Sequence, residues 1–129
     1  MSLVFVVMGL ALLQFLYFGF LVGKARGQFG VKAPATTGNE GFERVFRVQM
    51  NTLETLIVFV PSLWIFASYV DARWAVGLGV LYLIGRFLYC FGYIKDPSKR
   101  STGYLLSFGP TAILLFGGII GAVRASLPG

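Results

Sequence analysis

The sequence contains no histidine and only one cysteine, Cys90. Histidine is the commonest general base and a frequent metal ligand, so its absence excludes histidine-dependent catalysis and histidine metal centres. A single cysteine excludes an intrachain disulfide framework and a cysteine-rich metal site. We therefore expect no bound metal, and we expect Cys90 to be an inert packing residue inside its apolar segment.

Charged residues are also scarce. Asp, Glu, Lys and Arg make up 12% of the 129 residues, whereas 57% are hydrophobic. A soluble domain carries roughly 25% charged residues, so this composition is typical of a membrane protein. The net charge is +6, but the basic residues are split between two short connections and form no stripe. This distribution argues against a nucleic acid as a partner.

Four apolar stretches are long enough to cross a bilayer, which takes about 20 residues each. They cover residues 3–23, 41–69, 74–94 and 104–127. The sequence therefore predicts an all-α integral membrane protein, a bundle of four transmembrane helices with up-down topology. Its length predicts a single domain over residues 1–129. No small-residue cleavage signature follows the first stretch, so we expect that helix to be retained.

Local signals predict how these helices begin and pack. Gln14 interrupts the first apolar stretch, and a lone glutamine in a membrane helix usually hydrogen-bonds a neighbouring helix. Thr36, Thr37 or Asn39 can cap the second helix. The glycines within residues 117–121 predict a close approach between helices, because they have no side chains.

The second helix carries one polar face. Arg47, Asn51 and Glu54 are spaced i, i+4 and i+7, so they share that face, which continues into an apolar run. Ionisable side chains are costly in hydrocarbon and usually mark a functional site. An alternative is that Arg47 snorkels to lipid phosphates. That alternative leaves Glu54 unexplained, and the face therefore indicates a binding or catalytic site.

The third helix carries a second polar face. It is formed by Tyr82, Arg86, Tyr89 and Tyr93, spaced i, i+4, i+7 and i+11. An aromatic belt at the membrane interface is one interpretation of the tyrosines. A belt lies at one depth, whereas these residues span about three turns. The spacing therefore favours a groove lined by this face.

Lysine and arginine residues predict the orientation in the membrane. The basic residues of the first connection are Lys24, Arg26, Lys32 and Arg44, and those of the third are Lys95, Lys99 and Arg100. The second connection has only Arg73, and the two ends have only Arg124. The positive-inside rule places the first and third connections in the cytoplasm and both termini on the opposite side. The polar ends of both faces then meet near the cytoplasm.

The charges on these faces suit a ligand with several negative groups and one positive group. Arg47, Arg86 and Arg100 supply cations, and Glu54 supplies an anion. Glutathione, with two carboxylates, one ammonium and a thiol, fits this description; a phospholipid head group or a nucleotide also fits. Arginine pairs with carboxylates bidentately. A nearby guanidinium also stabilises a thiolate, the nucleophilic form of a thiol.

Several motifs resemble those of one family. The segment FERVFRVQMNTLE (residues 42–54) is similar to the second-helix signature of the MAPEG family, the membrane-associated proteins in eicosanoid and glutathione metabolism. The resemblance extends to VGKAR (22–26), PATTG (34–38), LYLIGRFLYCFGY (81–93) and KRSTGY (99–104). It implies a four-helix subunit, a homotrimer, and glutathione bound between adjacent subunits near the cytoplasm. It also implies conjugation of glutathione to hydrophobic electrophiles or lipid substrates from the bilayer, with lipid hydroperoxide reduction as a further activity.

The resemblance also implies roles for individual residues. Glutathione contacts are implied for Arg47, Asn51, Glu54, Arg86, Tyr89 and Tyr93 of one subunit, and for Arg26 and Gln49 of its neighbour. Arg100 matches the arginine that stabilises the thiolate, which makes it the expected catalytic residue. The family's non-catalytic lipoxygenase-activating branch lacks the arginine found here as Arg47, which favours an enzyme.

The chain departs from the family pattern at two positions. Thr55 replaces a glutathione-contacting tyrosine, and Gly27 replaces a second arginine of the leukotriene-synthesising members. These departures argue for a general transferase rather than leukotriene synthesis. Two other functions are compatible with the sequence: a non-catalytic MAPEG-type protein that binds lipid or acts as a scaffold, and a small exporter coupled to protonation of Glu54. The neighbouring arginines oppose the exporter, because they should keep Glu54 ionised.

Overall fold

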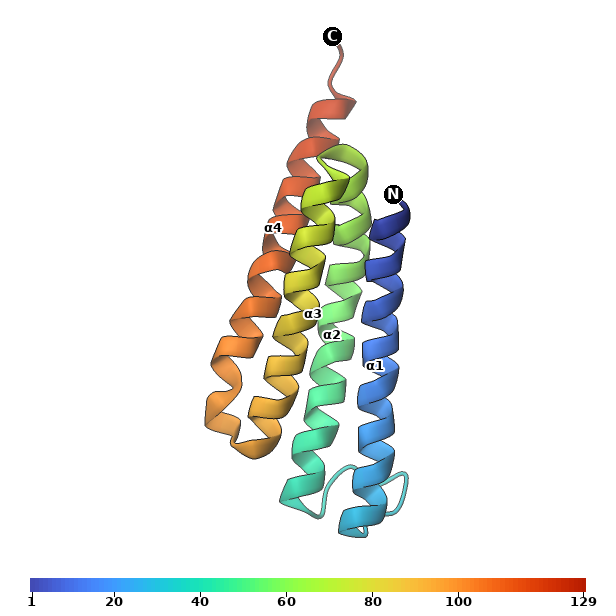
Figure 1. Ribbon diagram of the computed structural model, residues 1–129, viewed down its shortest axis with the longest axis vertical. Helices are drawn as coiled ribbons and strands as arrows, with labels where there is room; N and C mark the ends of the chain where they lie inside the picture. The colour runs from blue at the N-terminus through green and yellow to red at the C-terminus, as the bar shows by residue number, and fades with distance from the viewer.

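The computed structural model describes residues 1–129 as four long α-helices and one short 3-10 helix. Their bounds are α1 Ser2–Phe29, α2 Glu40–Tyr69, α3 Ala72–Lys95, η1 Pro97–Lys99 and α4 Arg100–Ser126 (Figure 1). All four long helices are long and apolar enough to cross a membrane. The structure confirms the prediction of an all-helical chain with four long apolar helices.

Two helices extend further than the sequence predicted. The first continues through Lys24 and Arg26 to Phe29 instead of ending near residue 23. It stops at Gly30, whose φ of 70° is left-handed and whose N–H donates to the carbonyl of Arg26. The fourth begins at Arg100 rather than near residue 104, because the 3-10 helix Pro97–Lys99 leads directly into it. Arg26 and Arg100 therefore both lie on helices.

Side-chain caps fix the starts of the other segments. Asn39 accepts a hydrogen bond from the backbone N–H of Phe42 at 3.0 Å and caps α2, as the sequence indicated. Asp71 caps α3 by accepting from the N–H groups of Trp74 and Arg73, and these bonds lower the pKa of its carboxyl. A backbone hydrogen bond from Ser98 lowers the pKa of Asp96, which caps the 3-10 helix in the same way.

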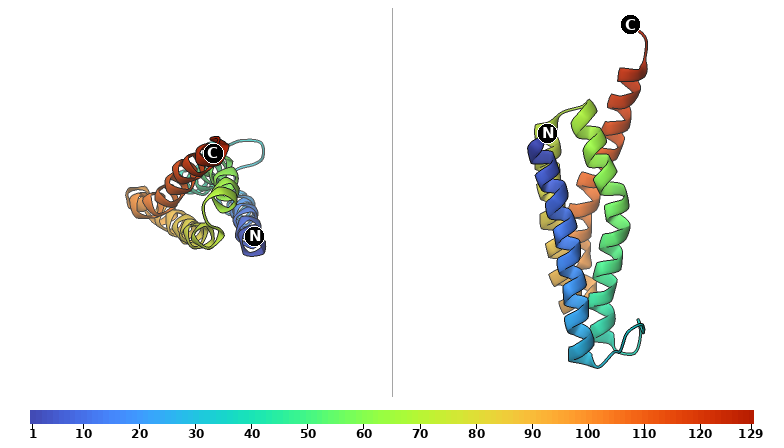
Figure 2. Two further views of the ribbon diagram at one scale, coloured as in Figure 1. Left: turned by 90° about the horizontal axis from the view of Figure 1, so that it is seen from above. Right: turned by 90° about the vertical axis from the view of Figure 1, so that its right-hand side faces the viewer.

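The two central helices, α2 and α3, each pack against both α1 and α4 (Figure 2). Glycines allow the closest approaches. A Cβ on Gly85 of α3 would lie 2.7 Å from the backbone nitrogen of Ser107 in α4. A Cβ on Gly121 would lie 2.9 Å from the carbonyl oxygen of Tyr69. The glycines within residues 117–121 thus pack α4 against α2, which confirms the close approach predicted for them.

One polar residue ties α1 to α3. Gln14 is 4% exposed, and its Nε2 donates to the backbone oxygen of Leu83 at 2.9 Å. This bond confirms the interhelical hydrogen bond predicted for the glutamine. The bond adds a polar link between two helices to a core that is otherwise built from hydrophobic residues such as Phe59, Leu63 and Leu114.

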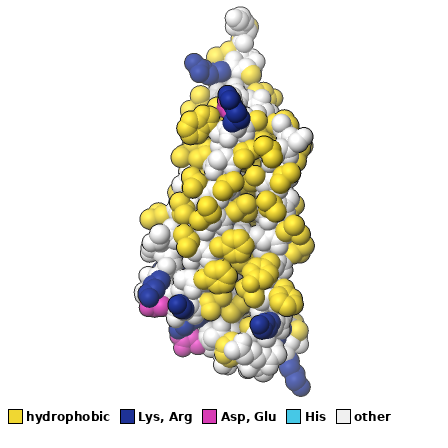
Figure 3. All heavy atoms as spheres, viewed as in Figure 1, with side chains coloured by type: hydrophobic (Ala, Val, Ile, Leu, Met, Phe, Trp, Pro, Cys, Tyr) yellow, Lys and Arg dark blue, Asp and Glu magenta, His cyan; other side chains and the backbone are white.

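Most of the surface is apolar. Only 31 of the 129 residues are buried, and large side chains such as Leu16 (65%), Ile57 (68%) and Phe116 (64%) are exposed. Figure 3 shows a broad hydrophobic band over the middle of the bundle, with most charged side chains at the end where α2 begins and α3 ends. A surface of this kind is stable in contact with lipid and would aggregate in water.

Candidate functional site

A cavity of about 340 Å³ lies at the charged end of the bundle. Its lining residues come from α2, α3 and α4, and we refer to it as the polar cavity: Arg47, Asn51, Tyr89, Tyr93, Arg100 and Tyr104. The first five were predicted from the sequence, and the fold brings them together. Tyr104 was missed because the sequence placed the start of the fourth helix at this residue. With the helix starting at Arg100, Tyr104 falls one turn later on the same face.

A second cavity of about 350 Å³ adjoins the first. It shares Arg47, Asn51 and Tyr104 with the polar cavity and adds Glu54, Thr55, Val58, Phe108 and Thr111. We refer to it as the mixed cavity, because it combines a carboxylate with apolar side chains. The two cavities form one groove that leads from two guanidinium groups to a hydrocarbon-lined end. Such a groove suits an anionic molecule beside an apolar one.

Arg47 and Glu54 form an ion pair along the side of the groove that α2 provides. Nη2 of Arg47 lies 3.5 Å from Oε1 of Glu54. Their side chains are 52% and 60% exposed, so water and salt screen this attraction. Exposed pairs of this kind contribute about 0–1 kcal/mol. A ligand that offers each partner a better-placed opposite charge can therefore replace the pair at little cost.

Arg86 lies beneath the groove, and none of its surface is exposed. Its Nη2 donates to Oδ1 of Asn51 at 2.7 Å and to Oγ1 of Thr52 at 3.1 Å. Its Nη1 donates to Oγ of Ser107 at 3.1 Å, and its guanidinium carbon lies 4.4 Å from the centre of the Tyr89 ring. Arg86 thus connects α3 to both α2 and α4. Arg86 was predicted to contact the ligand; the structure places it under Asn51, and it is not among the residues that line the two cavities.

Arg100 begins α4 and is exposed at the rim of the polar cavity. Its Nη1 donates to the carbonyl of Pro97 at 3.2 Å. The turn before it is held by Arg44, which donates to the carbonyls of Ile94 and Lys95 at 3.3 and 3.4 Å. Arg44 also pairs with Glu40 at 2.9 Å. This set of contacts fixes the end of α3 and therefore the position of Arg100 beside Arg47.

Arg26 and Gln49 do not line the groove. Arg26 donates from Nη1 to the carbonyl of Ala35 at 2.7 Å and lies 4.8 Å from the Phe42 ring centre. Gln49 faces α1, since a Cβ on Gly19 would lie 2.7 Å from its Nε2. The structure thus separates both residues from the other predicted site residues of the same chain.

The polar face predicted on α3 lines a groove over only part of its length. Tyr82 is 0% exposed and stacks on Phe59 with 3.8 Å between ring centres. Its hydroxyl lies 2.8 Å from Oγ1 of Thr55. The prediction of a continuous groove along this face is therefore wrong at Tyr82, because the residue packs into the core between α2 and α3. Only Tyr89 and Tyr93 reach the polar cavity.

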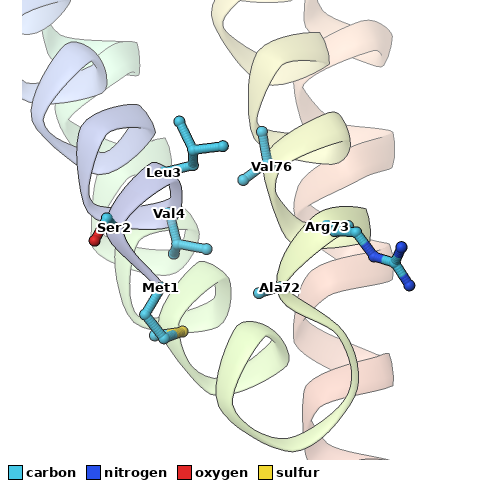
Figure 4. Close-up of a pocket in the computed structure, with 7 residues that line it drawn as sticks. All are labelled: Met1, Ser2, Leu3, Val4, Ala72, Arg73 and Val76. Atoms are coloured by element: carbon cyan, nitrogen blue, oxygen red, sulfur yellow. The ribbon is translucent and has the colours of Figure 1, made fainter.

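Another cavity, of about 390 Å³, lies at the opposite end of the bundle between α1 and α3. Met1, Leu3, Val4, Ala72 and Val76 provide most of its lining. Figure 4 shows that the side chain of Arg73 points away from α1 and from this space. Ser2 and Arg73 are the polar residues of its lining, and no cluster of charged side chains lies there as it does in the polar cavity.

Comparisons with known proteins show the family to which the chain belongs. The MAPEG family model matches residues 4–120. An uncharacterized protein of Synechocystis sp. is 48% identical over 111 residues, which cover 86% of this chain and 81% of that protein. Human microsomal glutathione S-transferase 2 is 42% identical over 111 residues, covering 86% and 76% of the two chains. Mouse leukotriene C4 synthase is 34% identical over 113 residues, covering 88% and 75%. This chain, a multi-pass integral membrane protein, belongs to the MAPEG family.

Proposed function

We propose that this protein is a membrane-bound glutathione transferase that conjugates glutathione to hydrophobic electrophiles, with reduction of lipid hydroperoxides as a second activity. One observation carries the proposal: the polar cavity, with Arg47 and Arg100, opens into the mixed cavity, with Glu54, Val58 and Phe108. An anionic thiol and an apolar acceptor can therefore lie side by side. Its relatives named glutathione S-transferase and leukotriene C4 synthase support the same chemistry.

The charges of the groove match those of glutathione. Its two carboxylates can pair with guanidinium groups, which bind carboxylates through two parallel hydrogen bonds. Its ammonium can pair with Glu54, which is 60% exposed and therefore accessible. Binding then exchanges the weak Arg47–Glu54 pair for two pairs with the ligand. The tyrosines Tyr89 and Tyr93, stacked with 5.5 Å between ring centres, provide an aromatic wall for the peptide backbone.

Arg100 is the proposed catalytic residue. Its positive charge at the cavity rim stabilises the thiolate of glutathione relative to the thiol, and the thiol proton leaves to solvent. The thiolate sulfur then attacks the electrophilic carbon, a carbon–sulfur bond forms, and the leaving group departs with its electron pair. With a lipid hydroperoxide, two glutathione molecules supply two electrons; the products are an alcohol, water and glutathione disulfide.

Assembly and orientation are part of the proposal. Arg26 and Gln49 lie away from the groove of their own chain, so they can complete the site only of a neighbouring copy. This separation supports a site shared between subunits, and the assembly that we propose is a homotrimer with glutathione between subunits. The excess of lysine and arginine near the groove supports a site that faces the cytoplasm, with both termini on the opposite side. Membrane lipid surrounds the exposed apolar band and delivers the hydrophobic substrate.

Turnover by the purified protein tests the proposal. We expect conjugation of glutathione to a general aryl halide, measured by absorbance of the conjugate, and reduction of lipid hydroperoxides in a second assay. The matched control is the same protein with Arg100→Ala. If the wild-type protein binds glutathione but turns over no electrophile or hydroperoxide, the protein is a non-catalytic binder. If it does not bind glutathione, the proposal is wrong altogether.

A further inference from the structure

The buried guanidinium of Arg86 packs on the Tyr89 ring, and all its hydrogen-bond acceptors are neutral oxygens. Its hydrogen-bond acceptors are Asn51, Thr52 and Ser107, and it forms no salt bridge. Its Nε is buried and has no partner. A buried charge without a counterion is costly, so a fold that retains one usually uses it. Because Arg86 does not line either cavity, that use must act through a neighbour.

The two hydroxyl partners of Arg86 can only accept from it. A hydroxyl has one hydrogen to donate. Oγ1 of Thr52 donates to the carbonyl of Val48 at 2.8 Å, and Oγ of Ser107 donates to the carbonyl of Gly103 or Tyr104, at 2.9 and 3.0 Å. Both hydroxyl hydrogens are therefore committed to backbone carbonyls of their own helices. The oxygens form a fixed cradle that holds the guanidinium in one orientation.

This cradle determines which end of the Asn51 amide faces the groove. A guanidinium has donors and no acceptor, so the Asn51 atom at 2.7 Å from Nη2 must be its oxygen. The amide NH₂ is then the group available to the cavities that Asn51 lines. With its oxygen occupied by Arg86, Asn51 is a hydrogen-bond donor toward the groove.

We infer that Arg86 is a positioning residue that holds Asn51 as a donor, so that the site selects a ligand with a carboxylate or carbonyl oxygen at this point. This inference rests on the proposed function for the identity of the ligand, glutathione. It also assigns a role to Thr52 and Ser107, which touch no ligand but aim the guanidinium. The positive charge of Arg86 further polarises the Asn51 amide and strengthens its donation to an anion.

The substitution Asn51→Asp separates this inference from its alternatives, because it is nearly isosteric and changes only the groove-facing donor and the charge. The carboxylate can pair with Arg86, so we expect a higher midpoint of thermal unfolding in detergent without any ligand. Asn51→Leu, which removes the acceptor, should lower that midpoint. Glutathione affinity of Asn51→Asp should fall at least about tenfold, because an acceptor now faces the ligand's acceptor.

The outcomes separate the inference from the proposed function. If Asn51→Asp lowers the midpoint as much as Asn51→Leu does, Arg86 does not hold the Asn51 oxygen and the inference is overturned. If Asn51→Asp is more stable but binds glutathione as well as the wild type or better, Asn51 does not act as a donor and the inference is again overturned. If the wild type binds no glutathione, the proposed function fails. The inferred hydrogen bond from Arg86 to the Asn51 oxygen is then tested by the thermal unfolding midpoints of Asn51→Asp and Asn51→Leu alone.

Ser107→Ala provides a second variant that leaves Asn51 unchanged. It removes the hydroxyl that accepts a hydrogen bond from Nη1 of Arg86. We therefore expect Arg86 to lose its fixed orientation and glutathione affinity to fall several-fold. Ser107→Thr keeps the hydroxyl acceptor and should restore affinity. Loss of affinity in both variants would indicate a packing effect and count against the inference. Ser101→Ala, at an exposed position on the same helix, is the matched control.

Discussion

The guanidinium of Arg47 lies 3.5 Å from the carboxylate of Glu54, and Asn51 lies between them along the same face of α2. The two charges satisfy each other in the absence of ligand, yet both remain more than half exposed. An exposed pair of this kind is weak. A ligand can therefore displace it at a small cost in free energy. A zwitterionic ligand can insert its carboxylate and ammonium between the two partners.

Replacement of Glu54 by glutamine should weaken glutathione binding. The change removes the charge opposite the ammonium, and the loss of a charged hydrogen bond costs roughly 2 kcal/mol. Isothermal titration with glutathione and with an analogue that lacks the amino group would measure this effect. The analogue should bind both proteins with similar affinity. Equal losses for both ligands would show that Glu54 does not contact the ammonium. Asp71→Asn, at the other end of the bundle, is the control for removal of an acid.

Replacement of Arg100 by alanine should reduce turnover more than affinity. A free thiol of this type ionises near a pKa of about 8.5, and a nearby guanidinium should lower that value. Thiolate absorbance should therefore appear when glutathione is added to the wild type at neutral pH. It should largely disappear in Arg100→Ala, while Arg47 and Glu54 still bind the peptide.

The neighbouring residue supplies the control for this variant. Lys99→Ala removes an exposed cation next to Arg100 that does not line the polar cavity. It should keep the thiolate signal and the turnover. If Arg100→Ala loses glutathione affinity but keeps turnover at saturation, Arg100 is a binding residue and the proposed mechanism is wrong.

Replacement of Gly103 by alanine should destabilise the bundle. A Cβ at Gly103 would overlap the backbone of Tyr89, so α3 and α4 would have to separate. Overpacking of this kind costs about 1–3 kcal/mol. The midpoint of thermal unfolding in detergent would measure the loss. Gly109→Ala is the matched control on the same helix, because nothing lies within 4 Å of its Cβ position. It should be neutral or stabilising, and equal losses in the two variants would contradict this account of Gly103.

The connection that precedes α4 should face the cytoplasm. The positive-inside rule requires this orientation for the end that carries Lys95, Lys99 and Arg100. Single-cysteine probes in a Cys90→Ala background would measure it with an impermeant thiol reagent on intact cells. Lys99→Cys should stay unlabelled until the membrane is opened, and Ser126→Cys should be labelled at once. The opposite pattern would reverse the orientation.

The sequence by itself determined the helices and the residues that share a face. Four apolar stretches define four helices, because hydrocarbon length and backbone hydrogen bonding leave a membrane segment few other structures. The spacing of Arg47, Asn51 and Glu54 predicted one polar face, and α2 is a continuous helix through all three. The cap at Asn39 was also readable, because capping depends only on neighbouring residues.

Only the tertiary structure decided what each face meets. Helical spacing put Tyr82 and Arg86 in line with Tyr89, but it carries no information on which helix covers which turn. Close packing at Gly85 and Gly103 brings α4 over part of α3, which buries Arg86 and leaves Tyr89 at the edge of the polar cavity. The groove exists because α2, α3 and α4 bring Arg47, Tyr93 and Arg100 together from distant parts of the chain. That convergence depends on interhelical packing, which no local pattern specifies.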